Sequence, residues 1–152
     1  MRYGSDDART LLAAAHADLV ERYGSGDENP VDPAQFDAPD GCFLVARQDE
    51  RPVACGGWRS LSGNPFLDQF EDVAELKRMY AVPAVRGTGV ADALLRALED
   101  SARGRGRRWM VLETGAEQPQ AIRFYRRHGY EPIANYGYYR QYSTCRSFGR
   151  SL

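Results

Sequence analysis

The chain has 152 residues, of which 43% are hydrophobic and 27% are charged, and its formal net charge is -1 at pH 7. A chain of this length can bury about 68–70% of its extended surface, so we expect a single domain over residues 1–152 with a core that needs no cross-links. The near-neutral charge excludes a general attraction to nucleic acid or membrane, and no apolar run approaches the roughly 18 residues of a membrane helix. The first residues lack the apolar core of a signal peptide, so we expect a cytoplasmic protein.

The N-terminal part is predicted to contain a helix, a loop and a hairpin. Apolar residues recur at helical spacing over Asp6–Tyr23. Residues 24–41 are rich in Gly, Pro, Asp and Asn, which indicates a loop with one helical turn allowed near Pro33–Phe36. Two short strands, at 42–47 and 52–59, follow with a polar turn between them, as in a β-hairpin.

The rest of the chain is predicted to alternate strands and helices. Pro83 closes a strand rich in long, aromatic and β-branched residues, and Pro119 and Gly129 mark the start and stop of a helix. The elements are, in order, a strand at 74–82, a helix at 90–103, a strand at 108–114, a helix at 119–129, and a final strand pair interrupted near 136–137. This order predicts a mixed α/β domain with a strand–turn–helix–strand crossover at its centre.

A glycine-rich turn, "VRGTGVADALL", joins the strand at 74–82 to the following helix. Such a turn is a good anion site, because unpaired N–H groups and the helix dipole both point at the ligand. A Walker A loop is excluded because no Lys follows such a glycine, and a dinucleotide fingerprint is excluded because its third glycine position holds Asp92.

The turn fits the pattern [Q/R]-x-x-G-x-[G/A] and resembles the acyl-CoA pyrophosphate loop of the GCN5-related N-acetyltransferases. Its six residues are Arg86, Gly87, Thr88, Gly89, Val90 and Ala91. The segment before it looks like the fourth strand of that family. The segment after it looks like the fifth strand and the following helix, with the A-x-x-x-Y-x-x-x-G-[FY] signature at Ala121, Tyr125, Gly129 and Tyr130. The match runs from about Cys42 to the C-terminus.

Three features depart from the family pattern. Gln118 stands where an Asn is often found, and Thr88 stands where the loop often has a basic residue. Only residues 1–4 are available for the usual first strand, so that strand is expected to be vestigial.

The resemblance implies a mixed, mostly antiparallel sheet with splayed fourth and fifth strands flanked by helices, and acetyl-CoA as co-substrate. N–H groups from Gly87 to Ala91 would bind pyrophosphate, and glycines let the main chain approach it closely. Main chain near Tyr80 would pair with the pantetheine, and an N–H of Met79 or Tyr80 would face the thioester oxygen. The expected acetyl-CoA-binding set is Tyr80, Ala81, Val82, Arg86, Gly87, Thr88, Gly89, Val90, Ala91 and Gln118.

The resemblance also assigns the catalytic roles. Tyr125 lies at the position of the general acid that protonates the CoA sulfur, although a tyrosine on such a helix is otherwise a core residue. Glu75 is the first candidate for the base that takes the amine proton, and Glu113 is the second. Glu75 could instead pair with Lys77 on the same strand face.

The acceptor is expected to be a small-molecule amine. The surrounding loops are acidic and aromatic, which favours a cationic partner. The residues concerned are Asp27, Glu28, Asp68, Glu71, Asp72, Phe66, Phe70, Tyr136, Tyr138 and Tyr139. A peptide or protein amine, and a non-catalytic acyl-CoA sensor, remain alternatives, and the sequence leaves a homodimer open.

The remaining motifs predict no metal site and no nucleic-acid site. Cys42, Cys55 and Cys145 have neither disulfide nor metal spacing and are expected to be small buried thiols. His16 and His128 are isolated on predicted helices, so we expect surface or packing roles. The run "ARGRGRR" follows a helix end, where arginines are ordinary partners of the helix dipole.

Overall fold

The computed structural model describes residues 3–23 and 29–152. The longer elements lie within two residues of the sequence predictions. In chain order they are α1 Asp6–Tyr23, η1 Pro33–Phe36, β1 Gly41–Gln48, β2 Arg51–Leu61, η2 Pro65–Leu67, β3 Val73–Ala81, η3 Pro83–Val85, α2 Val90–Gly104, β4 Trp109–Gly115, α3 Pro119–Arg127, β5 Glu131–Ile133 and β6 Cys145–Ser151.

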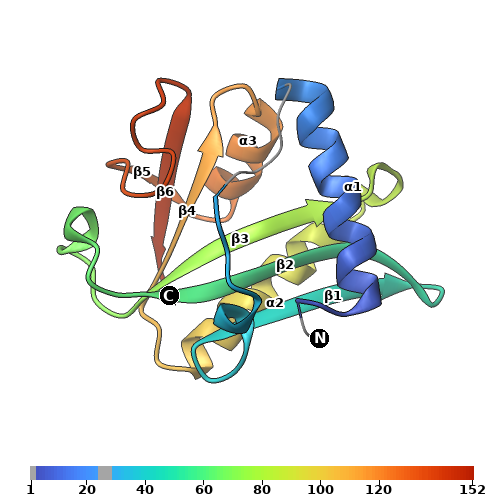
Figure 1. Cartoon of the computed structure of the whole chain (residues 1–152), viewed down its shortest axis with the longest axis horizontal. Helices are drawn as coiled ribbons and strands as arrows, with labels where there is room; N and C mark the ends of the chain where they lie inside the picture. Colours follow the sequence, from blue (N-terminus) through green and yellow to red (C-terminus); the bar gives the residue numbers. More distant parts are fainter. Residues whose placement is uncertain (1–2, 24–28) are drawn as a thin grey trace.

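The strands form one six-stranded sheet in the order β1-β2-β3-β4-β6-β5. All neighbours are antiparallel except β3 and β4, which are parallel. These two strands pair only between residues 73–75 and 109–111 and then separate, as Figure 1 shows. The predicted mostly antiparallel sheet with a splayed strand pair is therefore confirmed. No strand precedes α1 in residues 3–5, so the splayed pair is β3 and β4 of this chain.

The helices cover both faces of the sheet (Figure 1). On one face, Leu95 and Leu98 of α2 are fully buried against Trp58 and Leu76 of the sheet. On the other face, Leu11 of α1 packs in a second cluster with aromatic and thiol side chains of the hairpin. Two apolar layers thus hold the sheet, and the gap between β3 and β4 opens between them.

A β-bulge interrupts β3 where it leaves β4. Gly57 of β2 pairs with Lys77, but Cys55 pairs with Tyr80, so β3 carries one extra residue between the two pairs. Arg78 adopts a positive φ of 59° in this bulge. Because one extra residue reverses the alternation of a strand, the side chains that follow the bulge point to faces opposite to those expected without it.

The cysteines, the helix lengths and the metal-ligating side chains bear on the remaining expectations. Cys55 and Cys145 are buried free thiols, and Cys42 is half-buried. Across residues 3–23 and 29–152, no helix combines the length and apolar character needed to cross a membrane. The same residues contain no group of three or more metal-ligating side chains suited to hold an ion.

Candidate active site

The glycine loop between η3 and α2 has the backbone conformation of an anion cradle. Gly87 and Gly89 have φ angles of 79° and 92°, a region that costs other residues about 1–2 kcal/mol. A Cβ at either position would meet nothing within 4 Å, so glycine serves the backbone conformation and leaves the outer side of the loop open. Gly89 is also the residue from which α2 begins.

The N–H groups of this loop are available to a ligand. The first main-chain hydrogen bond that enters α2 runs from Ala93 N to Gly89 O, at 3.0 Å. Within the described residues, no main-chain acceptor pairs with the N–H of Gly87, of Gly89 or of residues 90–92. Together with the helix dipole, these donors form a site for a phosphate group.

Two side chains of the loop are already engaged in internal bonds. The Thr88 hydroxyl donates to Val85 O, and Arg86 Nε donates to Ala81 O at 2.9 Å. The Arg86 guanidinium also lies 5.7 Å from the centre of the Tyr80 ring. Arg86 thus ties the loop to the end of β3, and Thr88 ties it to η3.

Two cavities adjoin at the opening between β3 and β4. The first, of about 540 Å³, lies beside the glycine loop and α3, and Arg86, Gly87 and Gly89 line it. The second, of about 350 Å³, lies beside α1 and extends between the two strands. Residues that line both cavities are Asp18, Met79, Tyr80, Gln118, Ala121 and Tyr125.

Tyr125 of α3 lies where the cavities meet. Its side chain is largely buried, and this burial raises the pKa of the phenol well above its ordinary value, so the hydroxyl stays protonated. No described residue forms a hydrogen bond with Tyr125 Oη. Gln118 is the N-cap residue of α3, but its side chain forms no capping hydrogen bond with the helix. A protonated phenol and an amide therefore border the shared space.

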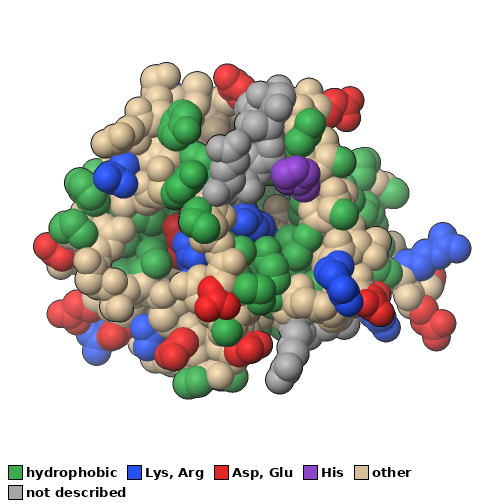
Figure 2. Space-filling model, in the orientation of Figure 1, with side chains coloured by type: hydrophobic (Ala, Val, Ile, Leu, Met, Phe, Trp, Pro, Cys, Tyr) green, Lys and Arg blue, Asp and Glu red, His purple; other side chains and the backbone are tan. Residues whose placement is uncertain are grey.

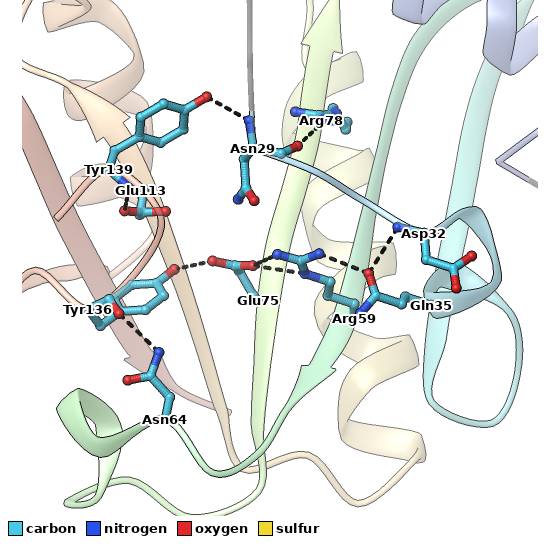
Figure 3. Close-up of polar contacts among 10 residues, drawn as sticks. All are labelled: Asn29, Asp32, Gln35, Arg59, Asn64, Glu75, Arg78, Glu113, Tyr136 and Tyr139. Atoms are coloured by element: carbon cyan, nitrogen blue, oxygen red, sulfur yellow. Dashed lines mark hydrogen bonds and ion pairs between the residues drawn. The ribbon is translucent and has the colours of Figure 1, made fainter.

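Glu75 is enclosed by hydrogen-bond donors (Figure 3). Its Oε1 accepts from Arg59 Nε at 3.0 Å and Nη2 at 2.9 Å, and its Oε2 accepts from Tyr136 Oη at 2.7 Å. Arg59 in turn donates to Gln35 Oε1 at 2.9 Å. Sequence reasoning missed these partners, although Arg59 stands directly opposite Glu75 in the antiparallel register of β2 and β3.

Glu113 of β4 has one satisfied and one unsatisfied oxygen. Its Oε2 accepts from Tyr139 N at 3.1 Å, whereas Oε1 is buried without a hydrogen-bond partner in the described part of the chain. Burial, and secondarily the charge of Glu75, raises the pKa of Glu113 above its usual range. A Cβ on Gly137 would collide with this carboxylate, so the loop packs directly over it. Glu113 is therefore a buried carboxylate of raised pKa with donors on one of its two oxygens only.

Lys77 of β3 faces the α1-side cavity and is buried. Burial lowers the pKa of its ammonium, and the nearby charge of Glu75 acts in the opposite direction. With its amide oxygen turned toward the lysine, Asn29 accepts from Lys77 Nζ at 2.7 Å.

Asn29 bridges the two sides of the opening, a role that no sequence signal indicated. Its N–H donates to Tyr139 Oη at 3.0 Å, and its carbonyl accepts from Arg78 Nη2 at 3.1 Å (Figure 3). The segment at Asn29 thus connects β3 with the loop that precedes β6.

Three of the carboxylates predicted to surround the acceptor lie away from the two cavities. Asp27 and Glu28 lie outside the described residues. Glu71 and Asp72 bind Arg108 at the far end of β3, with N–O distances of 3.0 and 3.6 Å, and neither they nor Asp68 line the two cavities. The acceptor side is therefore not bordered by those three carboxylates.

The two histidines differ in their surroundings. His16 of α1 lines the α1-side cavity. His128 is a packing residue, as expected, and its Nε2 lies 2.7 Å from Asp92 Oδ1, which also accepts from Arg127. This cluster ties the start of α2 to the end of α3.

Solved structures share the fold of this chain. The putative acyl-CoA N-acyltransferase from Klebsiella pneumoniae superposes with a TM-score of 0.79 and is 28% identical, with 100% of this chain and 94% of that chain covered. The PaiA N-acetyltransferase from Thermoplasma acidophilum, solved in complex with coenzyme A, has the same fold, with a TM-score of 0.69 and 14% identity over 97% of this chain and 94% of that one. The fold is that of the acyl-CoA N-acyltransferases.

Sequence comparison identifies the family. The model of the Acetyltransferase (GNAT) family matches residues 11–130. A protein named IAA acetyltransferase, from Azospirillum brasilense, is 32% identical over 121 residues, which are 80% of this chain and 74% of that protein. An uncharacterized N-acetyltransferase of Escherichia coli, YjgM, is 33% identical over 64% of this chain and 56% of its own length. The chain belongs to the GNAT family and is an acyltransferase, as the sequence predicted.

Proposed function

We propose that this chain transfers the acetyl group of acetyl-CoA to the primary amine of a small molecule by direct attack in a ternary complex. The observation that carries the proposal is the pair of adjoining cavities. One lies beside the anion-binding loop and the other beside α1, and Tyr80, Gln118 and Tyr125 line both. Donor and acceptor could then be held together at the opening between β3 and β4.

The residues of the donor side fit acetyl-CoA. The N–H groups of Gly87, Gly89 and the first turn of α2 would hold the pyrophosphate, because no main-chain carbonyl of the described residues accepts a hydrogen bond from them. After Glu75, the edge of β3 that faces β4 is no longer paired, so main chain near residues 80–82 can pair with an extended pantetheine. Bound acetyl-CoA supplies an activated thioester carbon.

The bulge in β3 supplies the oxyanion donor. Arg78 and Met79 form the irregular step between the Lys77 and Tyr80 pairs, which turns main-chain groups out of the regular ladder. An N–H of Met79 or Tyr80 would then donate to the developing oxyanion, and removing one such donor in other enzymes costs about 10²–10³ in rate.

Proton transfers are assigned to one residue on each side. Tyr125 donates its phenolic proton to the departing thiolate; burial, which raises the pKa of the phenol, keeps that proton in place until the thiolate forms. Glu113 takes the proton of the attacking amine, directly or through water. We prefer Glu113 to Glu75, because Glu113 lines the α1-side cavity, whereas Glu75 does not and both of its oxygens are occupied.

The dimensions of the α1-side cavity support a small acceptor. Its volume is about 350 Å³, within the range of about 300–1,000 Å³ that is usual for small-molecule pockets. The hydrogen bonds of Asn29 to Tyr139 and Arg78 connect β3 with the loop before β6.

Thermal shift with acetyl-CoA tests the donor site. Gly89→Val should abolish the stabilisation that acetyl-CoA confers on the wild type, because a left-handed φ is lost and the N–H groups reorient. Gly106→Val is the matched control: Gly106 also has a positive φ, of 79°, and open space around its Cβ position, but it lies after the other end of α2. Persistence of the acetyl-CoA shift in Gly89→Val would overturn the loop assignment.

Kinetics with a panel of amines tests the reaction. Initial velocity is measured at several acetyl-CoA and amine concentrations. Direct attack in a ternary complex requires intersecting lines in the double-reciprocal plots. Parallel lines would contradict direct attack. Wild-type protein that binds acetyl-CoA but acetylates no amine of a broad panel would contradict catalysis altogether.

A further inference from the structure

We infer that the acceptor amine carries an extended apolar body, which lies along one side of α1 between Leu19 and Leu12 while its amino group reaches the opening between β3 and β4. The inference rests on the proposed function and specifies its substrate class. That class is the alkyl- and arylalkylamines, with a hydrocarbon portion about as long as two turns of a helix.

The apolar residues of α1 form one continuous stripe, and only its first part is used by the core. Ala8, Leu12, Ala15 and Leu19 recur at helical spacing, so they lie on one side of the helix. Ala8 is fully buried in the cluster beneath α1, and Leu12 packs against the edge of that cluster. Ala15 and Leu19 are half-buried and belong to none of the hydrophobic clusters of the described residues. The second half of the stripe therefore leaves the core.

This second half of the stripe lines the α1-side cavity. Leu12, Ala15 and Leu19 all border the 350 Å³ space. An α-helix rises by about 1.5 Å per residue, so the stripe runs for about 10 Å from Leu12 to Leu19. Small-molecule pockets gain most of their affinity from apolar surface that is removed from water. An apolar wall of this length beside a reaction centre therefore fits a hydrocarbon chain.

The end of the stripe at Leu19 lies nearest the donor. Among the described residues of α1, Asp18 alone borders both cavities, as Tyr125 of α3 also does. Figure 1 shows the C-terminal end of α1 beside α3. At the other end of the stripe, Leu12 and Tyr3 border the α1-side cavity and pack against the cluster beneath α1. The amino group would therefore lie near Tyr125, with the hydrocarbon portion extending back toward Tyr3.

Polar side chains form the rest of the cavity wall. Lys77 of β3 and Glu113 of β4 border it, and both form hydrogen bonds within the fold. His16 and Asp18 flank the apolar stripe, one on each side of it. Figure 2 shows this mixture, with hydrophobic and basic side chains around one hollow of the surface. Because Lys77 and Glu113 already have partners, a ligand gains most by covering the apolar stripe.

A homologous series of n-alkylamines tests the inference. Initial rates are measured from ethylamine to octylamine at saturating acetyl-CoA, and kcat/KM is referred to the unprotonated amine. We expect kcat/KM to rise by about two- to fourfold with each added methylene until the chain covers the stripe, because each methylene removed from water favours binding. A kcat/KM that stays level or falls from ethylamine onward would overturn the inference.

Paired substitutions on α1 assign the selectivity to the stripe. Leu19→Asn should lower the octylamine-to-ethylamine ratio of kcat/KM by about tenfold, because a polar side chain of similar size replaces part of the apolar wall. Val20→Asn is the matched control, since Val20 is 41% exposed and does not border the cavity, and it should keep the wild-type ratio. A wild-type ratio in Leu19→Asn would contradict the role of the stripe.

A second pair of variants keeps the test decisive if Leu19→Asn does not fold. Ala15→Phe should shorten the longest amine that the enzyme uses well, because the ring fills the middle of the stripe. Ala13→Phe places the same ring at an exposed position of α1 that does not border the cavity, so it should keep the wild-type dependence on chain length. An unchanged dependence in Ala15→Phe would count against the stripe. The acetyl-CoA thermal shift verifies that each variant is folded and binds the donor.

The same measurements separate this inference from the proposed function. Acetylation of short or polar amines, with no gain from chain length, would overturn the inference and leave the proposed function standing. Binding of acetyl-CoA without acetylation of any amine would overturn both.

Discussion

Neutralising the two buried glutamates should have opposite consequences, because one carboxylate is enclosed by donors and the other is not. In Glu75→Gln the guanidinium of Arg59 loses its counter-charge. The side chains of Arg59 and Glu75 are only 11% and 3% exposed, so solvent cannot replace it. Breaking a buried ion pair in this way costs about 3–5 kcal/mol, which for a domain of this size lowers Tm by roughly 6–20 °C.

In Glu113→Gln the fold should be nearly unaffected. The amide oxygen still accepts from Tyr139 N, and the repulsion between two carboxylates disappears. Since the pKa of Glu113 is raised in the folded state, the wild type loses stability as pH rises from the ordinary pKa of 4.5 through the raised one, and the Gln variant lacks this loss. Activity should fall by about 10²–10⁴, as for removal of a general base, with the acidic limb of the pH–rate profile flattened.

The assay combines thermal unfolding with the pH dependence of kcat/KM for both variants. The expected pattern is a large loss of Tm with the acidic limb retained in Glu75→Gln, and the reverse in Glu113→Gln. A flattened limb at unchanged Tm in Glu75→Gln would make Glu75 the base. A wild-type profile in Glu113→Gln would refute its assignment and leave water as the proton acceptor.

Three further substitutions test other contacts. Tyr125→Phe should lower kcat by about 10²–10⁴ while the acetyl-CoA thermal shift stays, and an unchanged kcat would exclude the phenol as the acid. Asp92→Asn should destabilise the protein at neutral pH but not in strong acid. Hydrogen bonds from Arg127 and, to a smaller extent, His128 lower the pKa of Asp92, so their contribution to stability is lost as pH falls through that lowered pKa. An equal difference in Tm between variant and wild type at both pH values would contradict this. Tyr139→Phe removes the acceptor of Asn29 N and should raise KM for the amine by about fivefold, with KM for acetyl-CoA unchanged, since a hydrogen bond contributes about 1 kcal/mol.

The local features of the donor side could be predicted from sequence because they depend on neighbouring residues. Two glycines at positive φ and the following apolar stripe are encoded within a few positions, and so are the strand end at Pro83 and the helix start at Pro119. Such short-range preferences need no knowledge of tertiary contacts. The mostly antiparallel sheet and the splayed strands followed from the family resemblance, not from these local signals.

The contacts of the acceptor side could not be predicted because they join distant segments. Tyr136 reaches Glu75 across 61 positions, and Asn29 reaches Tyr139 across 110. A loop residue such as Asn29 has no periodicity that would place it over a strand gap. The pairing of Arg59 with Glu75 was accessible in principle, since a hairpin-like register sets it, but only once the number of residues in each strand is known.

The bulge of β3 did leave a signal in the sequence, and it connects the fold to the proposed chemistry. Apolar residues that pack toward α2 stand at 74, 76, 79 and 81, so the alternation slips by one position between Leu76 and Met79. Gly56 lies opposite the slip, where a Cβ would come within 2.8 Å of Met79 Sδ. In a regular strand, Lys77 and Tyr80 would point to opposite faces, because they are three positions apart. The slip thus places Tyr80 on the same face as Lys77, at the irregular step where we propose that a main-chain N–H faces the thioester.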